Sequence, residues 1–128
     1  LRKAHTIRLT VGSKTANVDG KPVDMPAAPY IRLDRLLVPV RAVSDALGCT
    51  VTWDATSGTA TLTSEEGVLA LTTHSPVLQV NGKLVAMDSV PEIVGSGTMM
   101  IPVRHIAEVL HCKVAWDAPA RTATITAI

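Results

Sequence analysis

The stretch VPVRAVSDALGCTVTWD at residues 38–54 recurs as IPVRHIAEVLHCKVAWD at residues 101–117. The flanking sequence repeats in the same order, with VDGKPV at 18–23 matched by VNGKLV at 80–85, and TATL at 59–62 matched by TATI at 122–125. Matches in the same order along two halves of a chain are hard to produce by chance. We therefore interpret the chain as two tandem repeats, residues 1–65 and residues 66–128.

Each repeat is expected to begin with a strand and a tight hairpin. Apolar residues alternate with polar ones over 7–11 and 69–71, as in a strand with one buried face. Asp19-Gly20 and Asn81-Gly82 are dipeptides that tolerate positive φ at both central positions of a two-residue hairpin turn. The sequence therefore predicts one β-hairpin at each dipeptide.

Each repeat is also expected to contain one short helix. Proline fixes φ near the helical value, so Pro39 and Pro102 are predicted to occupy the first helical positions. The preceding residues, Val38 and Ile101, offer no capping side chain. Apolar residues then recur at helical spacing and predict a buried face on each helix: Val40, Val43 and Leu47 in the first, and Val103, Ile106, Ala107 and Leu110 in the second.

The two helices are predicted to end differently. Gly48 supplies a left-handed stop after the first helix. His111 stands at the matching place after the second helix, where a side chain makes the same conformation more costly. The sequence therefore predicts another kind of helix end in the second repeat.

A strand after each helix is expected to face the core. Alternate residues of these strands share one face: Cys49, Val51 and Trp53 in the first repeat, and Cys112, Val114 and Trp116 in the second. We expect the tryptophans to be core anchors and the cysteines to be separate buried thiols without a disulfide. The predicted fold class is α+β, in which each repeat is a short antiparallel β-sheet packed around one short α-helix.

Composition argues against several classes of partner. The formal net charge is +1, with 12 Lys plus Arg against 11 Asp plus Glu, so we expect no nucleic-acid partner. One Tyr, two Trp and no Phe disfavour an aromatic platform for sugars. The apolar run at 36–40 is far shorter than the ~20 residues of a membrane helix, so we expect no membrane insertion.

The sequence lacks the usual motifs of catalytic and metal sites. It contains no Gly-rich phosphate loop, no nucleophile elbow and no H-E-x-x-H helix. Its four histidines, which are poorly spaced for joint metal coordination, are His5, His74, His105 and His111. We therefore assign no catalytic, cofactor-binding or metal-ligating residues, and we expect no cofactor.

Arg41 and Arg104 occupy matching positions near the helix starts, where a cation opposes the helix dipole. Another interaction must therefore hold them. The matched carboxylates Asp54 and Asp117 are the natural partners within each repeat, and the planar guanidinium could also bond strand carbonyls. The alternative is that these arginines bind a ligand.

The ordered motifs resemble one protein family. They are an N-G-K-x-V hairpin, a (V/I)-P-V-R helix start, an L-G-C-x-V-x-W-D strand and a T-x-T-(I/L) strand. The pattern resembles the copper amine oxidase N-terminal-like domain, or stalk domain, in two consecutive copies. Departures are His111 for the expected glycine, and Leu33-Asp34-Arg35 where a glycine-containing turn is usual.

This resemblance implies a short antiparallel sheet wrapped around a helix, a unit that recurs in secreted and cell-surface proteins of Gram-positive bacteria. It also implies that the copper and the quinone cofactor of the oxidases belong to a separate catalytic domain. Nothing in this chain resembles that domain. We therefore expect that the chain is not an enzyme.

The leading hypothesis is an extracellular, cell-surface structural or spacer module that self-assembles or joins another cell-surface protein. Free strand edges could accept a strand from a neighbour, and residues 1–11 are the expected donor. The alternative is a binding module for a cell-wall polymer or peptide. A third hypothesis is an enzyme or metal protein.

We predict that the protein, purified without chelator, holds no stoichiometric copper and oxidises no amine, because its sequence offers no convincing ligand cluster. Elemental analysis and an amine oxidation assay test this prediction. One tightly held copper or zinc ion per chain would contradict it.

Overall fold

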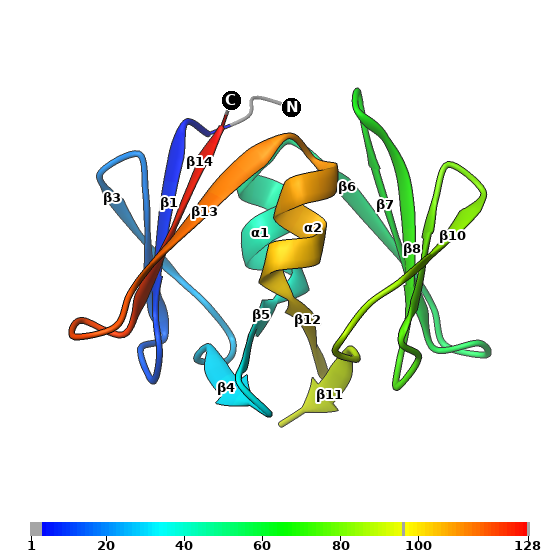
Figure 1. Cartoon of the computed structure of the whole chain (residues 1–128), viewed down its shortest axis with the longest axis horizontal. Helices are drawn as coiled ribbons and strands as arrows, with labels where there is room; N and C mark the ends of the chain where they lie inside the picture. Colours follow the sequence, from blue (N-terminus) through cyan, green and yellow to red (C-terminus); the bar gives the residue numbers. More distant parts are fainter. Residues whose placement is uncertain (1–3, 96, 128) are drawn as a thin grey trace.

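The computed structural model describes residues 4–95 and 97–127, which form antiparallel β-sheets and two short helices (Figure 1). The first half contains β1 (Thr6–Thr10), β2 (Thr15–Val18), β3 (Lys21–Asp24), β4 (Tyr30–Arg32), β5 (Arg35–Pro39), α1 (Val40–Ala46), β6 (Thr50–Asp54) and β7 (Thr59–Ser64). The second half contains β8 (Gly67–Thr72), β9 (Val77–Val80), β10 (Lys83–Ala86), β11 (Glu92–Val94), β12 (Thr98–Pro102), α2 (Val103–Val109), β13 (Cys112–Asp117) and β14 (Thr122–Ala127). The predicted antiparallel strands and short helices are therefore confirmed.

The strands of the described residues form three sheets. One five-stranded sheet has the order β13-β14-β1-β2-β3, and the other has the order β10-β9-β8-β7-β6. A smaller sheet has the order β11-β12-β5-β4. In Figure 1 the two five-stranded sheets stand at the left and right, with both helices and the four-stranded sheet between them. All three sheets take strands from both halves of the chain.

This membership differs from the expectation that each half builds its own sheet. Strand β1 lies between β14, from the other end of the chain, and β2. Ile7 lies opposite Ile125 in this pairing, and Leu9 lies opposite Ala123. Alternating apolar residues identify a strand and its buried face, but they do not select its neighbour. The sequence pattern therefore does not reveal that strands of the two halves pair with each other.

The two halves meet at the centre of the four-stranded sheet. Val38 of β5 lies directly opposite Ile101 of β12, its counterpart in the sequence match. Because counterpart residues face each other, the halves are related by an approximate two-fold axis at this pair. Helix α1 follows β5 directly and α2 follows β12 directly, so both helices begin beside the axis.

One cluster of buried apolar side chains includes residues from both halves. It draws on the sheets and on both helices, with Leu9, Leu71, Val43 and Ile106 among its fully buried members. Burial of each such side chain contributes roughly 1.5–3 kcal/mol. Ser44 is a buried polar residue of α1, and its hydroxyl donates to the carbonyl of Val40 within the helix. The two halves therefore share one core.

The predicted hairpin turns are confirmed. Asp19 and Gly20 both have positive φ, at 51° and 85°, and Asn81 and Gly82 have 51° and 84°. The turn side chains also reach the neighbouring strand. The Asp19 carboxylate accepts the Thr6 N–H at 2.8 Å, and the Asn81 side-chain oxygen accepts the Val68 N–H at 2.9 Å. Each turn thus fixes both its hairpin and the start of the preceding strand.

The helices begin one residue later than predicted. Pro39 and Pro102 are the N-cap residues, with ψ at 131° and 110°, and neither helix has a side-chain cap. Residues before the helix keep an extended backbone, so proline is compatible with the cap position itself. The predicted apolar faces are confirmed, because the three residues predicted for the first face and the four predicted for the second are all buried.

Both helices end in the same way, which corrects the prediction for His111. Leu47 and Leu110 are the C-cap residues. The next residues, Gly48 and His111, both adopt the left-handed conformation, with φ of 75° and 60°. The shared core fixes the path of the chain into β6 and β13, so the side chain of His111 does not change the turn. The unfavourable conformation remains as local strain.

The remaining sequence predictions concern the cysteines, the N-terminal strand and membrane-spanning helices. Cys49 and Cys112 are both buried and form no disulfide, as predicted. Residues 1–3 of the expected donor segment lie outside the described residues. Of the rest, Thr6–Thr10 forms β1, with Ala4 and His5 before it and Val11 after it. No helix within 4–95 and 97–127 has the length and apolar character needed to cross a membrane.

We predict that His111→Gly raises the free energy of unfolding by about 1 kcal/mol. Left-handed backbone costs ~1–2 kcal/mol for a residue with a side chain, and the greater freedom of unfolded glycine offsets part of the gain. Gly48→Ala is the matched opposite change and is expected to lower stability by about 1 kcal/mol. Urea denaturation measures both. Unchanged stability of the His111→Gly variant would show that the position carries no strain.

Candidate functional site

Two grooves lie at related places on the molecule. The Trp116 groove has a volume of about 520 Å³ and the Trp53 groove about 320 Å³, within the range of small-ligand pockets. Six pairs of counterpart residues line the two grooves, with one member of each pair in each groove. They are Pro39, Val40, Arg41, Val51, Trp53 and Ala60 in the Trp53 groove, and Pro102, Val103, Arg104, Val114, Trp116 and Ala123 in the Trp116 groove. Each groove therefore combines a helix start with the strand that follows the helix.

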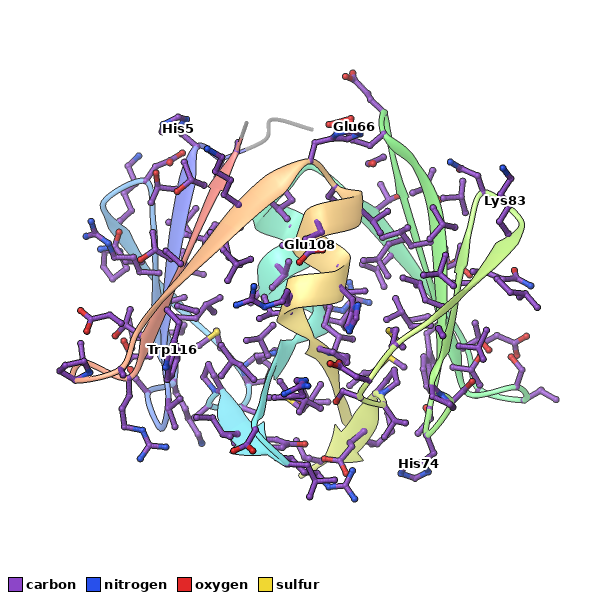
Figure 2. All side chains as sticks on the ribbon, viewed as in Figure 1. His5, Glu66, His74, Lys83, Glu108 and Trp116 are labelled. Carbon is purple, nitrogen blue, oxygen red and sulfur yellow. The ribbon has the colours of Figure 1, made fainter. Side chains whose placement is uncertain are left out.

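The two tryptophans line these grooves and are not core anchors, which corrects the prediction. Trp53 is 47% exposed and Trp116 is 41% exposed. Each helix has seven residues and is about 10 Å long, so it covers only the beginning of the strand that follows. Figure 2 shows Trp116 toward the end of β13 that is remote from α2. The predicted strand face is right, but the helix is too short to bury its far end.

The predicted pairing of the arginines with Asp54 and Asp117 is also wrong. Asp54 accepts a turn hydrogen bond from the Thr56 N–H at 3.0 Å, and Asp117 accepts one from the Ala120 N–H at 3.3 Å. Aspartate side chains commonly bond the backbone two or three residues ahead, which stabilises the turn. Within the described residues, the exposed guanidinium groups of Arg41 and Arg104 have no ion pair or hydrogen bond.

The Trp116 groove contains a charged cluster that the Trp53 groove lacks. Arg35 contacts Oδ2 of Asp88 through both Nε and Nη2 at 2.7 Å, and His105 Nε2 lies 2.8 Å from Asp88 Oδ1. Hydrogen bonds from Arg35 and then His105 hold the pKa of Asp88 well below its usual range. The same contact raises the pKa of Arg35. The matching positions in the Trp53 groove region are Pro26, Ala42 and Thr98, so the cluster has no counterpart.

A second polar cluster ties the edges of the four-stranded sheet together. The Tyr30 hydroxyl donates to Glu92 Oε1, and Arg32 Nη1 lies 3.0 Å from Glu92 Oε2. Burial, followed by the bond to Glu92, raises the pKa of Tyr30. These contacts join β4 of the first half to β11 of the second half. Their place at the join between the halves indicates a structural role.

The histidines do not come together. His5 and His74 are exposed and lie at opposite corners of the molecule (Figure 2). His111 is exposed in its turn, and only His105 makes a side-chain contact with a carboxylate, among the described residues. In that part of the chain, no three His, Cys, Asp or Glu side chains gather as metal ligands would.

The sequence pattern does not predict the cluster of Arg35, Asp88 and His105. Arg35 precedes Asp88 by 53 residues, and neither belongs to a repeated motif. For the grooves themselves, the sequence offers one signal, which is the presence of Arg and Trp at matching positions of both halves. The pattern of strand faces nevertheless predicts structural roles for these residues, because it does not give the length of the helix that covers each strand.

A family model described as the copper amine oxidase N-terminal domain matches the chain over residues 2–56 and 17–125. The two ranges overlap and together cover most of the chain, which is consistent with tandem copies. No curated protein and no solved structure matches the chain.

We predict that Asp88→Asn weakens the dependence of stability on pH in the acid range. The folded pKa of Asp88 is depressed, so its contribution is present above the unfolded value of about 3.9 and is lost as the pH falls below that value. The wild type should therefore lose stability on acidification more steeply than the variant, and the variant should be the less stable protein at pH 7. Thermal melting between about pH 7 and pH 2 measures both effects.

Asp24→Asn is the matched control, because Asp24 is exposed and its carboxylate makes no bond within the described residues. This control should follow the wild type at every pH. Identical melting profiles for Asp88→Asn and Asp24→Asn would refute a stabilising role for the Asp88 contacts.

Proposed function

Because the chain belongs to the copper amine oxidase N-terminal domain family, we propose that it is a cell-surface structural module whose copies join by exchanging strand β1. The matched family is a non-catalytic domain of those oxidases. An extracellular location is proposed from the resemblance to stalk domains. We also propose that residues 1–65 and 66–128 are duplicated units, each with one helix and the strands around it.

The observation that carries this proposal is the seam between β14 and β1. Strand β1 lies inside a five-stranded sheet, yet its neighbour β14 comes from the other end of the chain. The matching seam in the second sheet joins β7 to β8, and a short turn at Glu65 and Glu66 connects these two strands. The β14–β1 seam is therefore held by non-covalent contacts where its counterpart has a covalent link.

A second copy could supply the same β1 strand with the same contacts. Exchange of an identical element between copies is a low-cost route to assembly, because the pairing in the assembly repeats the pairing in the monomer. Because β1 is bonded to β2 and β2 to β3, β1 would be exchanged together with these two strands, and the segment between β3 and β4 would act as the hinge. It contains Pro26 and Pro29, which favour an extended chain in the preceding residues. Repeated exchange would produce chains of modules.

The test uses a disulfide across the seam in the double variant Arg8→Cys with Thr124→Cys. The Ala127 N–H bonds the His5 carbonyl, and the Val11 N–H bonds the Arg121 carbonyl. Arg8 and Thr124 lie midway and form a non-hydrogen-bonded pair, with Cα atoms ~4.5 Å apart. This separation suits a disulfide.

We predict that the oxidised double variant gives a covalent ladder of oligomers on non-reducing gels after concentration, and cross-linked monomers when dilute. Thr61→Cys with Ala70→Cys is the matched control, because this pair occupies the corresponding place in the β7–β8 seam. The control should give cross-linked monomers only. Large particles that contain only cross-linked monomers would exclude strand exchange, and a lack of particles at every concentration would exclude self-assembly.

A further inference from the structure

We propose that the Trp53 and Trp116 grooves bind an extended peptide that carries an acidic side chain two residues away from an aliphatic one. This proposal assigns a ligand to the two grooves and does not depend on exchange of β1. Three features carry it: an unpaired cation, an exposed indole and a free strand edge. All three occur at both grooves.

The cation is clearest in the Trp53 groove. Of the described residues that line this groove, Arg41 is the one that is charged, and the rest are mostly apolar. Its guanidinium has no ion pair or hydrogen bond within 4–95 and 97–127. The fork of N–H donors matches a carboxylate through two parallel hydrogen bonds. An acidic group is therefore the complementary ligand for this position.

The indole supplies the apolar contact. Trp53 and Val51 lie on the same face of β6 and line the groove with Ala60, which is opposite Trp53 on β7. Nearly half of the Trp53 surface is exposed, although tryptophan offers a large apolar area for burial. An aliphatic side chain placed against the indole would remove this surface from water. The groove thus has separate places for an acidic and an aliphatic group.

The edge of the sheet selects an extended chain. Strands β6 and β13 are the outer strands of the two five-stranded sheets, and within the described residues each pairs on one side only. A peptide strand can add to such an edge through main-chain hydrogen bonds. Alternate side chains of the added strand would then lie on the groove side, ~7 Å apart. In the proposed complex, one of these side chains contacts the tryptophan and the next contacts the arginine.

The occurrence of the same combination twice strengthens the assignment. Several other matching residues of the two halves form turns or fill the core, as Asp54, Asp117, Leu47 and Leu110 do. The arginines and tryptophans are exposed at both places, where neither turn formation nor core packing requires them. A shared ligand accounts for both pairs.

The two grooves should differ in affinity for an acidic peptide. Asp34 and Asp88 also line the Trp116 groove. Asp88 is paired with Arg35 and lies beside His105, and Asp34 adds a second negative charge near Arg35. None of the described residues that line the Trp53 groove is acidic. The Trp53 groove is therefore the tighter site.

The probe is the peptide acetyl-Thr-Val-Thr-Glu-Thr-Val-amide, with a matched peptide in which glutamine replaces glutamate. Binding is followed by the fluorescence of the two tryptophans and by calorimetry for the stoichiometry. We expect two sites per chain and about 10- to 100-fold weaker binding of the glutamine peptide, as for loss of a charged hydrogen bond. Arg41→Gln should remove the tighter site, Arg104→Gln the weaker site, and the double variant both.

Arg8→Gln is the matched control, because Arg8 is an exposed arginine that lines neither groove. It should bind the peptide as the wild type does. Equal binding of the two peptides, equal loss in Arg8→Gln and Arg41→Gln, or no binding at about 1 mM peptide would overturn the proposal. Isovalerate is tested alone, and binding as tight as that of the peptide would make the grooves sites for small carboxylates instead.

Discussion

The pairing of strands from opposite halves of the chain is the constraint on which this structure depends. A two-stranded hairpin and a seven-residue helix are both marginal when isolated in water. Each half supplies two such hairpins, one such helix and a three-stranded unit, and the five-stranded sheets arise when the halves combine. The contacts of Ile7 with Ile125 and of Leu9 with Ala123 close the first sheet. The helices are then held between sheets that neither half could complete alone.

Local structure could be predicted from the sequence because local residues determine it. The Asp19-Gly20 turn, the buried face of each helix and the buried cysteines follow from side-chain type and spacing. The pairing of strands from opposite halves, the exposure of Trp53 and the Arg35 contact with Asp88 depend on which distant segments come into contact. Residue spacing within one half carries no information about these long-range contacts, so the candidate grooves emerged only from the structure.

Near the approximate two-fold axis, a difference in residue type between the two halves stabilises their contact. Tyr30 and Glu92 occupy counterpart positions, and the tyrosine hydroxyl bonds the carboxylate. Two identical halves would place two tyrosines or two carboxylates near the axis, and like charges at close range repel. The unlike pair gives a hydrogen bond, reinforced by Arg32. Away from the axis, Asp88 and His105 give one groove charges that the other lacks. These differences therefore join the halves and make their surfaces distinct.

The position of the β14–β1 seam determines how the module would respond to mechanical load. Thr6 pairs with Thr126, so the beginning of β1 and the end of β14 lie at the same end of the seam (Figure 1). Tension applied to the two ends would open the ladder one pair at a time, as a zipper opens, and would not shear all its hydrogen bonds together. Any segment attached before β1 or after β14 would also begin at this same end of the seam. A module whose β1 pairs with its own β14 therefore offers little resistance to tension applied through both ends. If it were linked at both ends, its body would project to one side of the linked chain.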